Sequence, residues 1–251
     1  MPKQRGIIKI EGTIGDLTFM KTQDGYLVKE KTHISADRIA SDQAFVRTRE
    51  NNAEFGRAGK AGKVLRNAVR TLLQNAKDRR VTSRLTTDML RVLQADTTSI
   101  RGMRNVLDGE LELLQGFDFN VNAKLGTTIY APYTNTIDRV AGTLTVNIPS
   151  FIPAERIAAP AGSTHFNIVS MAAEVDFESE TFITDSKESG VLPWDATATA
   201  LFNLANAVTP NSTQPLFLLL GIQFYQQVNG INYALKNGAF NALSLVNVSG
   251  V

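Results

Sequence analysis

The chain has no cysteine among its 251 residues and only two histidines. A disulfide, a thiol nucleophile and a thiolate metal site are therefore excluded. His165 follows the turn Ala161–Thr164, but no nearby serine–carboxylate arrangement makes it a credible catalytic base. We therefore expect that the protein is not an enzyme and that it needs no metal and no cofactor.

Long hydrophobic runs are also missing. The longest, Pro215–Ile222, is far shorter than the roughly 20 residues that a membrane-spanning helix needs. The N-terminal sequence MPKQRGIIKIEG has no apolar stretch followed by a small-residue cleavage site. We expect no membrane span and no cleaved signal. The location is left open, between assembly into a particle after cytoplasmic synthesis and non-classical release.

One run of the sequence is similar to a nucleotide-binding motif but does not match it. The run Gly56–Lys63 superficially resembles a phosphate-binding loop, because it combines glycines with a terminal lysine. Its glycine spacing is one residue too long, and Val64 stands where a serine or threonine would hold magnesium. The run does not predict a nucleotide site.

Aromatic residues are absent from Gly56 to Gly116, although lysine and arginine are frequent there. Proteins that bind single-stranded nucleic acid combine basic and aromatic side chains, so only duplex binding through charge is left open. Residues 1–105 carry 21 Lys and Arg against 11 Asp and Glu, a net +10, whereas residues 106–251 carry 5 against 13, a net −8. This asymmetry indicates an acidic partner or head-to-tail self-association, and simple solvation of both surfaces is the alternative.

The segment Ala44–Lys77 has the period of an amphipathic helix, with Asp42 in position to cap its N-terminus. Its apolar side is formed by Ala58, Ala61, Val64, Leu65, Ala68, Val69 and Leu72, and its basic face by Lys60, Lys63, Arg66 and Arg70. Gly56, Gly59 and Gly62 each cost about 1 kcal/mol inside a helix. Either the helix breaks near Gly56, or the glycines let another backbone approach closely.

Three parts follow along the chain. Residues 1–35 are predicted to form a β-ribbon arm of two or three strands, with a hairpin turn at Asp24-Gly25. A polar connector, His33–Ser41, leads from this arm to the helices. Residues 36–108 should be a basic helical hairpin, in which a second helix runs from Thr82 or Ser83 to about Leu107. Residues 109–251 should form an acidic antiparallel β-sandwich. The predicted class is α+β.

Alternation of polar and apolar residues, with turn signals between runs, supports the β part. The predicted strands are Phe117–Asn122, Thr127–Pro132, Gly142–Ile148, His165–Phe177, Thr181–Thr184, Ala198–Ala205, Pro215–Gln227, Ile231–Leu235 and Ala242–Val248. Asn229-Gly230 and Asn237-Gly238 are hairpin signals, so the last three strands should form a meander. An immunoglobulin-like sandwich fits better than a parallel sheet, because no crossover helix intervenes.

An acidic strand is predicted at Glu174, Asp176, Glu178 and Glu180, whose alternation would place all four on one face. Such carboxylates can bind calcium or form a catalytic pair. No glycine-containing acidic loop accompanies them, so a solvated strand face is favoured. We assign them to self-association, opposite the basic helix face of another copy.

The segments GTIGDLTFMKTQDGYLVKEK (12–31), RTRENNAEFGRAGKAGK (47–63) and GIQFYQQVNGINYALKNGAFNAL (221–243) resemble an uncharacterised family of short proteins from Bacteroidetes and their phage-like elements. The resemblance extends over most of the chain. It implies no active-site residues, since the family has no defined activity.

Three functions are compatible with these features. The first is a self-assembling structural subunit of a filament, tube or virion-like particle, joined by head-to-tail contacts between the basic and acidic parts. The second is a nucleic-acid-binding accessory protein that uses the helical hairpin. The third is a binding module whose sandwich loops hold a ligand, with Trp194 and Tyr133 as candidate contacts.

Overall fold

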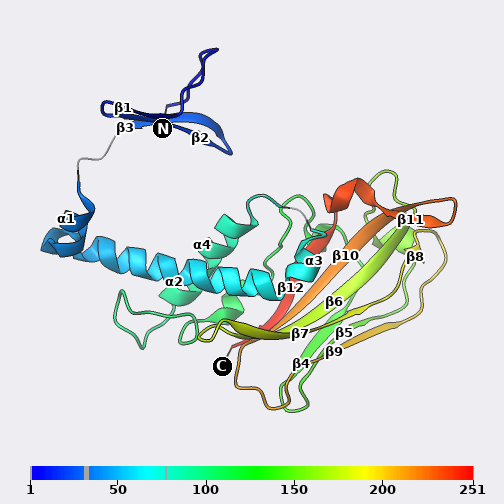
Figure 1. Cartoon of the computed structure of the whole chain (residues 1–251). Helices are drawn as coiled ribbons and strands as arrows, with labels where there is room; N and C mark the ends of the chain where they lie inside the picture. The colour runs from blue at the N-terminus through cyan, green and yellow to red at the C-terminus, as the bar shows by residue number, and fades with distance from the viewer. Residues whose placement is uncertain (1, 31–33, 77, 251) are drawn as a thin grey trace. The chain divides into compact units, whose positions relative to one another are not determined.

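The computed structural model describes residues 2–30, 34–76 and 78–250, so Lys77 and residues 31–33 of the predicted arm lie outside it. The chain forms two compact units, Met1–Glu50 and Asn51–Val251. Each unit is described by itself, with the elements labelled as in Figure 1.

The N-terminal unit contains the predicted strands. They are β1 (Gly12–Ile14), β2 (Leu17–Thr22) and β3 (Gly25–Glu30), and they form an antiparallel sheet in the order β1-β2-β3. Thr22 pairs with Gly25, so the loop residues are Gln23 and Asp24, one residue earlier than predicted. Gly25 begins the strand with a φ of +111°, which glycine adopts without strain.

The predicted polar connector contains a short helix, α1 (Ala36–Ser41), whose first turn is capped by Ser35. Asp42 caps the following 3₁₀ turn, η1 (Gln43–Phe45), by accepting a hydrogen bond from the backbone N–H of Ala44. Asp42 therefore caps the turn that precedes the long helix and not the long helix itself, which begins at Val46.

The long helix α2 (Val46–Ala68) continues through all three glycines, so the first of the two alternatives, a break near Gly56, is wrong. The helix is interrupted at Val69, whose φ of −94° and ψ of 14° are not helical, and a short α3 (Arg70–Leu73) follows. Helix α4 (Val81–Gln94) runs antiparallel to α2, as predicted. Arg66 of α2 donates to Thr82 at the start of α4, and Gly62, one turn earlier in α2, meets Met89 further along α4.

The second helix is 13 residues shorter than the predicted end at Leu107, because Asp96 ends it. This buried carboxylate accepts hydrogen bonds from the backbone N–H groups of Thr98, Ser99 and Asn105 and so holds a loop in place of further helical turns. Burial alone would raise its pKa, but the hydrogen bonds outweigh burial and lower the pKa to about 2. Ile100 is consequently exposed rather than packed on α2.

Two antiparallel sheets make up the rest of the second unit. The larger contains β6 (His165–Asp176), β7 (Thr181–Glu188), β8 (Leu192–Pro193), β10 (Leu216–Val228), β11 (Ile231–Ala234) and β12 (Ala242–Ser249). Its order is β11-β10-β6-β7, with β12 also on β10 and β8 also on β6. The smaller sheet has the order β4-β5-β9, from β4 (Thr134–Asp138), β5 (Thr143–Ile148) and β9 (Phe202–Ala207).

Several strand predictions need correction. Phe117–Asn122 and Thr127–Pro132 are not strands, and they make only isolated bridges at Asp118 and Ile129 within the described residues. Short helical turns occupy this region instead, η2 (Leu111–Leu114) and η3 (Leu125–Thr127), and further turns are α5 (Pro153–Arg156) and η4 (Leu235–Gly238).

The predicted C-terminal meander is wrong at its last step. Strand β12 pairs with β10 rather than with β11, so β11 and β12 follow one another along the same edge of β10. Gly238, with a φ of +79°, belongs to η4 and lies against the backbone carbonyl of Asn75, where a β-carbon would not fit. The Asn237-Gly238 turn therefore redirects the chain instead of closing a hairpin.

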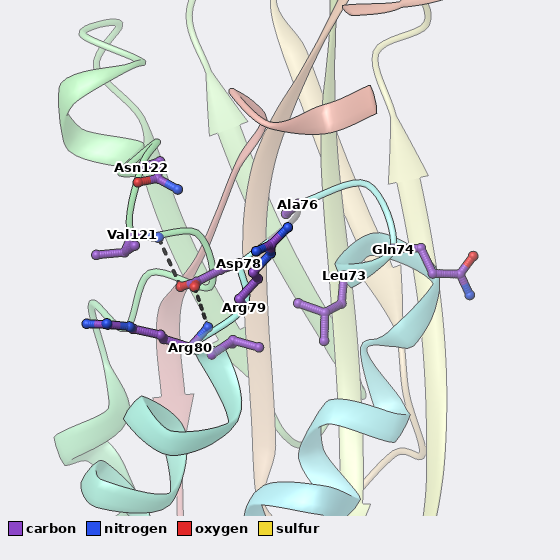
Figure 2. A pocket seen from close by; sticks show the side chains of 9 residues that line it. Leu73, Gln74, Ala76, Asp78, Arg79, Arg80, Val121 and Asn122 are labelled. Carbon is purple, nitrogen blue, oxygen red and sulfur yellow. Dashed lines mark hydrogen bonds between the residues drawn. The ribbon is translucent and has the colours of Figure 1, made fainter. Parts of the chain in front are cut away.

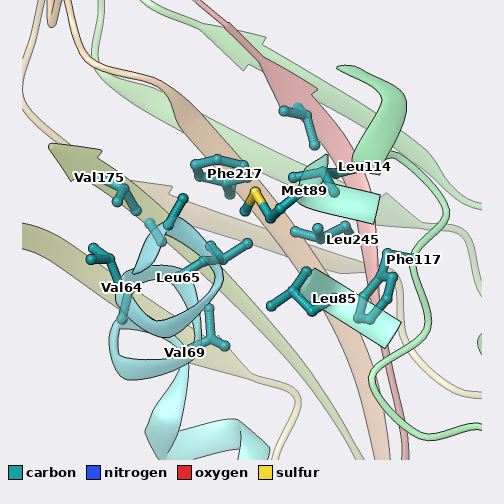
Figure 3. Packing of buried hydrophobic residues seen from close by; sticks show 14 of the residues in the cluster. Val64, Leu65, Val69, Leu85, Met89, Leu114, Phe117, Val175, Phe217 and Leu245 are labelled. Atoms are coloured by element: carbon teal, nitrogen blue, oxygen red, sulfur yellow. The ribbon is translucent and has the colours of Figure 1, made fainter. Parts of the chain in front are cut away.

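The second unit has three layers, because β6 and β10 are buried on both faces along most of their length. One face of the large sheet packs against α2 and α4 in a cluster that includes Leu65, Met89 and Phe217 (Figure 3). The other face packs against the small sheet in a second cluster, with Leu144 of β5 and Leu218 of β10 among its members. The basic helices therefore share a core with the sheet that they cover.

Candidate functional site

The predicted basic face lies on α2 and α3, and its four members have different environments. Lys63 and Arg70 are exposed. Arg66 is half-buried, because its guanidinium donates to the Gly62 carbonyl at 3.2 Å and to the Thr82 hydroxyl at 3.0 Å. Lys60 forms an ion pair within the chain, 2.9 Å from the Glu180 carboxylate.

The four predicted acidic residues do not share one strand. Strand β6 ends at Asp176, whose carboxylate accepts hydrogen bonds from the backbone N–H groups of Glu178 and Ser179 and shapes the turn into β7. Glu180 lies in that turn with a φ of +60°. The prediction of a continuous acidic strand face is therefore wrong, because the chain reverses after Asp176.

Glu174 is buried and has a structural environment. Its carboxylate accepts hydrogen bonds from the Ser212 hydroxyl at 2.6 Å and the Thr209 backbone N–H at 3.0 Å. Burial raises its pKa, but these hydrogen bonds and the charge of Arg139 outweigh burial, so the pKa lies below its usual value. Glu174 ties the end of β6 to the loop before β10.

The basic and acidic sets therefore meet inside one molecule at Glu180, which pairs with Lys60 and is also attracted by the charge of Lys63. Each side chain of this pair is about half exposed, so solvent screens the attraction. The hydrogen bond and charge of Lys60 lower the pKa of Glu180. Lys60, Lys63 and Arg70 are the exposed members of the basic face.

The three helix glycines also differ. Only Gly62 is buried, and a β-carbon there would lie 3.6 Å from Cγ of Leu85. At Gly56 and Gly59 a β-carbon would meet no atom within 4 Å. The close backbone approach that the glycines allow does not occur at these two positions within the described chain.

Gly59→Ala is expected to raise the free energy of unfolding by about 1 kcal/mol, because alanine is the better helix former and the site has room. Urea denaturation of the full chain would measure it. Gly116→Ala is the control: no atom lies within 4 Å of its β-carbon either, but alanine is strained at a φ of +84°, so this variant should lose stability. A loss of stability in Gly59→Ala would contradict the open surroundings of this position.

A cavity of about 820 Å³ lies where α3 leads into α4, lined by Leu73, Gln74, Ala76, Asp78, Arg79, Arg80, Val81, Val121 and Asn122. Figure 2 shows Asp78 at its centre, bonded to the backbone N–H groups of Arg80 and Val121. The same carboxylate forms an ion pair with Arg84 at 2.6 Å. Burial raises the pKa of Asp78, and these hydrogen bonds together with Arg84 lower it overall.

The cavity is lined by charges of both signs, with the Asp78 carboxylate at its centre and the exposed side chains of Arg79 and Arg80 at its edge. Its lining includes no histidine, serine or tyrosine to act as a base or nucleophile. Among the residues that the structure describes, no group of three or more His, Asp or Glu could hold a metal ion.

The candidate ligand contacts of the β part are packing residues. The indole N–H of Trp194 donates to the Ile157 carbonyl at 3.2 Å, and Tyr133 packs against the same hydrophobic cluster. Burial and the charge of Asp118 raise the pKa of Tyr133. The ring nitrogen Nδ1 of His165 lies 2.9 Å from the Thr164 hydroxyl at the start of β6.

One surface was predicted and one was not. The sequence predicts an apolar face of the N-terminal ribbon at Leu17, Phe19, Tyr26 and Val28, and in the structure none of residues 2–30 and 34–50 is buried. The exposed β10–β11 hairpin was not found by sequence reasoning. Its sequence signal is a lack of charge, because Lys236 is the single charged residue in the sequence from 196 to 251.

No protein-family model, curated protein or solved structure matches the chain. The resemblance to a Bacteroidetes family stays a prediction. Within the described ranges, no helix is both long enough and apolar enough to cross a bilayer.

Proposed function

We propose that the protein is a self-assembling structural subunit of a filament, tube or particle, and that its N-terminal unit binds a neighbouring copy. One observation carries the proposal: the N-terminal sheet has an apolar face but no buried residue among positions 2–30 and 34–50. A small sheet needs a covered apolar face to be stable in water. A neighbouring copy would supply that cover.

The strand register defines this face. Phe19 lies opposite Val28, and Ile14 lies opposite Leu17, so these four side chains project to one side together with Tyr26. Ile14 and Leu17 are exposed, and the other three are half-buried. Ile7 and Ile8, in the loop before β1, are also exposed. The unit thus presents an unusual amount of apolar surface for its size.

Backbone hydrogen bonds hold the N-terminal sheet together, so the side chains of its apolar face have defined positions. Residues 2–4 line the outer side of β3, where Gln4 donates its N–H to Tyr26 and Pro2 accepts from Val28. The Lys9 ammonium bonds to the carbonyls of Gln4 and Gly6 and holds the loop between them. This edge is covered, which leaves the face as the surface for a partner.

The charge asymmetry enters the proposal as a second contact. Lys63 and Arg70 are exposed on the basic helices and can meet acidic groups of another copy. Lys60 contributes less, because Glu180 of its own chain already holds it. Contacts between unlike surfaces propagate into rings or filaments instead of closing as a pair.

The test uses the full chain with Ile14→Ser and Leu17→Ser together. We expect the wild-type protein to form large species in light scattering and negative-stain images, and the double variant to lose them. The matched control is Val140→Ser, which removes an exposed apolar side chain from the second unit. Large species of equal abundance in the double variant, or a monomeric wild type at low salt, would refute the proposal.

The same measurements separate the alternatives. A monomeric wild type that retains duplex DNA at low salt, with a steep loss on adding salt, would favour nucleic-acid binding through the arginines around the cavity. The ligand-binding module gains no specific support, since Trp194 and Tyr133 pack against the core. The immunoglobulin-like class of the two packed sheets likewise stays a prediction.

A further inference from the structure

The β10–β11 hairpin extends beyond its sheet. Asn229 and Gly230 form its turn, with φ angles of 51° and 78°, as a type I′ turn requires. Strand β6 begins at His165, opposite Tyr225 of β10, so the hairpin beyond Tyr225 has no β6 partner. All four residues of β11 are exposed.

One face of this hairpin is apolar. Val228 pairs directly with Ile231, and Tyr233 lies two residues further along β11 on the same side. Their exposed fractions are 46% for Val228, 57% for Ile231 and 54% for Tyr233. Three neighbouring side chains therefore form one exposed apolar patch beside a strand edge.

The outer edge of β11 carries no described partner, and the strand has no charged residue and no proline. Its pairing in the described chain is with β10 alone, so alternate residues direct N–H and C=O groups outward. Natural edge strands are protected by lysines, prolines or bulges. Here no charged residue and no proline occurs from Leu216 to Leu235. The edge of β3, by contrast, is covered by residues 2–4 and has Lys29 near its end.

We propose that β11 pairs in antiparallel fashion with β11 of a second copy, about a twofold axis that passes at Asn232. This register places Ile231 opposite Tyr233 of the other copy, twice, and pairs of aromatic and β-branched residues stabilise antiparallel sheets. The Asn232 amide oxygen accepts from Gln227 of its own hairpin at 3.0 Å, and its NH₂ group can donate across the axis to the other Asn232. No like charges oppose one another.

The result is a sheet continuous across two molecules. The inference goes beyond the proposed function, because a twofold contact of this kind closes as a dimer and does not need the N-terminal unit. With both contacts present, dimers become the repeating units of the assembly. A β-strand edge added to another is a common mode of protein association.

The absence of cysteine allows a direct test by crosslinking. In the proposed register, Asn232→Cys places two thiols on directly opposed residues, with Cβ atoms about 4.5–5.5 Å apart and close to the separation of a disulfide. We expect mild oxidation of this full-chain variant to give a covalent dimer on non-reducing gels. Asn203→Cys, on an exposed position of β9, is the control and should stay monomeric. Equal crosslinking of the two variants would overturn the proposal.

A charge exchange tests the same register without oxidation. It is made in the background Ile14→Ser and Leu17→Ser, which we expect to be dimeric. Asn232→Lys or Asn232→Glu alone should give monomers, because like charges then oppose one another at the axis, and mixing the two should restore a heterodimer. A monomeric background protein would refute the hairpin contact and leave the proposed function standing. Unchanged dimers with Asn232→Lys would refute the hairpin contact as well.

Discussion

Phe217→Ala should lower the free energy of unfolding by about 3–5 kcal/mol, the usual cost of removing a fully buried aromatic ring. Phe217 is completely buried near the start of β10, on the face that α2 and α4 cover (Figure 3). Its ring meets Phe177 edge to face, with centroids 6.1 Å apart. The substitution therefore opens a cavity where helices and sheet meet.

The measurement is urea denaturation of the full chain, followed by far-UV circular dichroism. The matched control is Phe182→Ala on β7, where the ring is 42% exposed and less contact is lost. We expect the control to change stability by less than about 1 kcal/mol. Equal effects at the two positions would mean that the helices do not cover this face of the sheet.

Arg139→Ala should cost about 2–3 kcal/mol, through the loss of charged hydrogen bonds to backbone carbonyls. One guanidinium nitrogen donates to the carbonyls of Ser212 and Gln214, at 2.7 and 2.8 Å. The other donates to the carbonyls of Ser249 and Gly250, at 3.1 and 2.6 Å. One side chain thus ties the β4–β5 turn to the segment before β10 and to the end of β12.

Two variants make this prediction specific. Arg139→Lys keeps the charge but loses the planar fork, so we expect it to recover only part of the stability. Arg156→Ala removes an exposed arginine from α5 and should have little effect. If Arg139→Ala and Arg156→Ala unfold at the same urea concentration, the role assigned to Arg139 is wrong.

The pH dependence of Arg139→Ala gives an independent readout through Glu174. Arg139 contributes to the lowered pKa of that carboxyl, after the hydrogen bonds from Ser212 and Thr209. A lowered folded-state pKa stabilises the protein above the unfolded-state pKa, and this contribution is lost as the pH falls through the folded value. In Arg139→Ala the folded value rises towards the unfolded value, so the part of the stability that is lost between neutral and acid pH should be smaller than in the wild type.

The sequence was most informative where one rule acts over many residues. The helical period correctly predicts that Ala58, Leu65 and Val69 are buried, because one side of α2 lies on a sheet. The alternating pattern between turn signals correctly predicts β6 and β10, and Asn229-Gly230 correctly predicts the hairpin of β10 and β11. The mixed helix and antiparallel sheet class follows from these elements together.

Prediction failed where a single buried polar group decides the path of the chain. The helical period continues past Gln94, but Asp96 collects three backbone N–H groups and ends the helix. Alternation of Glu174 and Asp176 with apolar residues indicates an exposed acidic face, yet Ser212 supplies a partner for Glu174 from a distant loop. Such long-range partners leave no local pattern, so periodicity cannot reveal them.

The candidate surfaces were harder to predict than the fold. The Lys60–Glu180 pair joins residues from two separate parts of the chain, and only the packing of α2 on the sheet brings them together. The exposed face of the N-terminal sheet has the same alternation as a buried one, so the sequence cannot distinguish them. The uncharged edge of β11 was visible in the composition, as a run without lysine or glutamate.

The three-layer arrangement also sets the order in which the protein can fold during synthesis. The apolar sides of α2 and α4 are made early, but their cover includes Phe217 on β10 and Leu245 on β12, which the ribosome adds last. Until these strands have been synthesised, the apolar sides of α2 and α4 stay exposed in the nascent chain. Such a chain is exposed to aggregation and is a natural client for a chaperone.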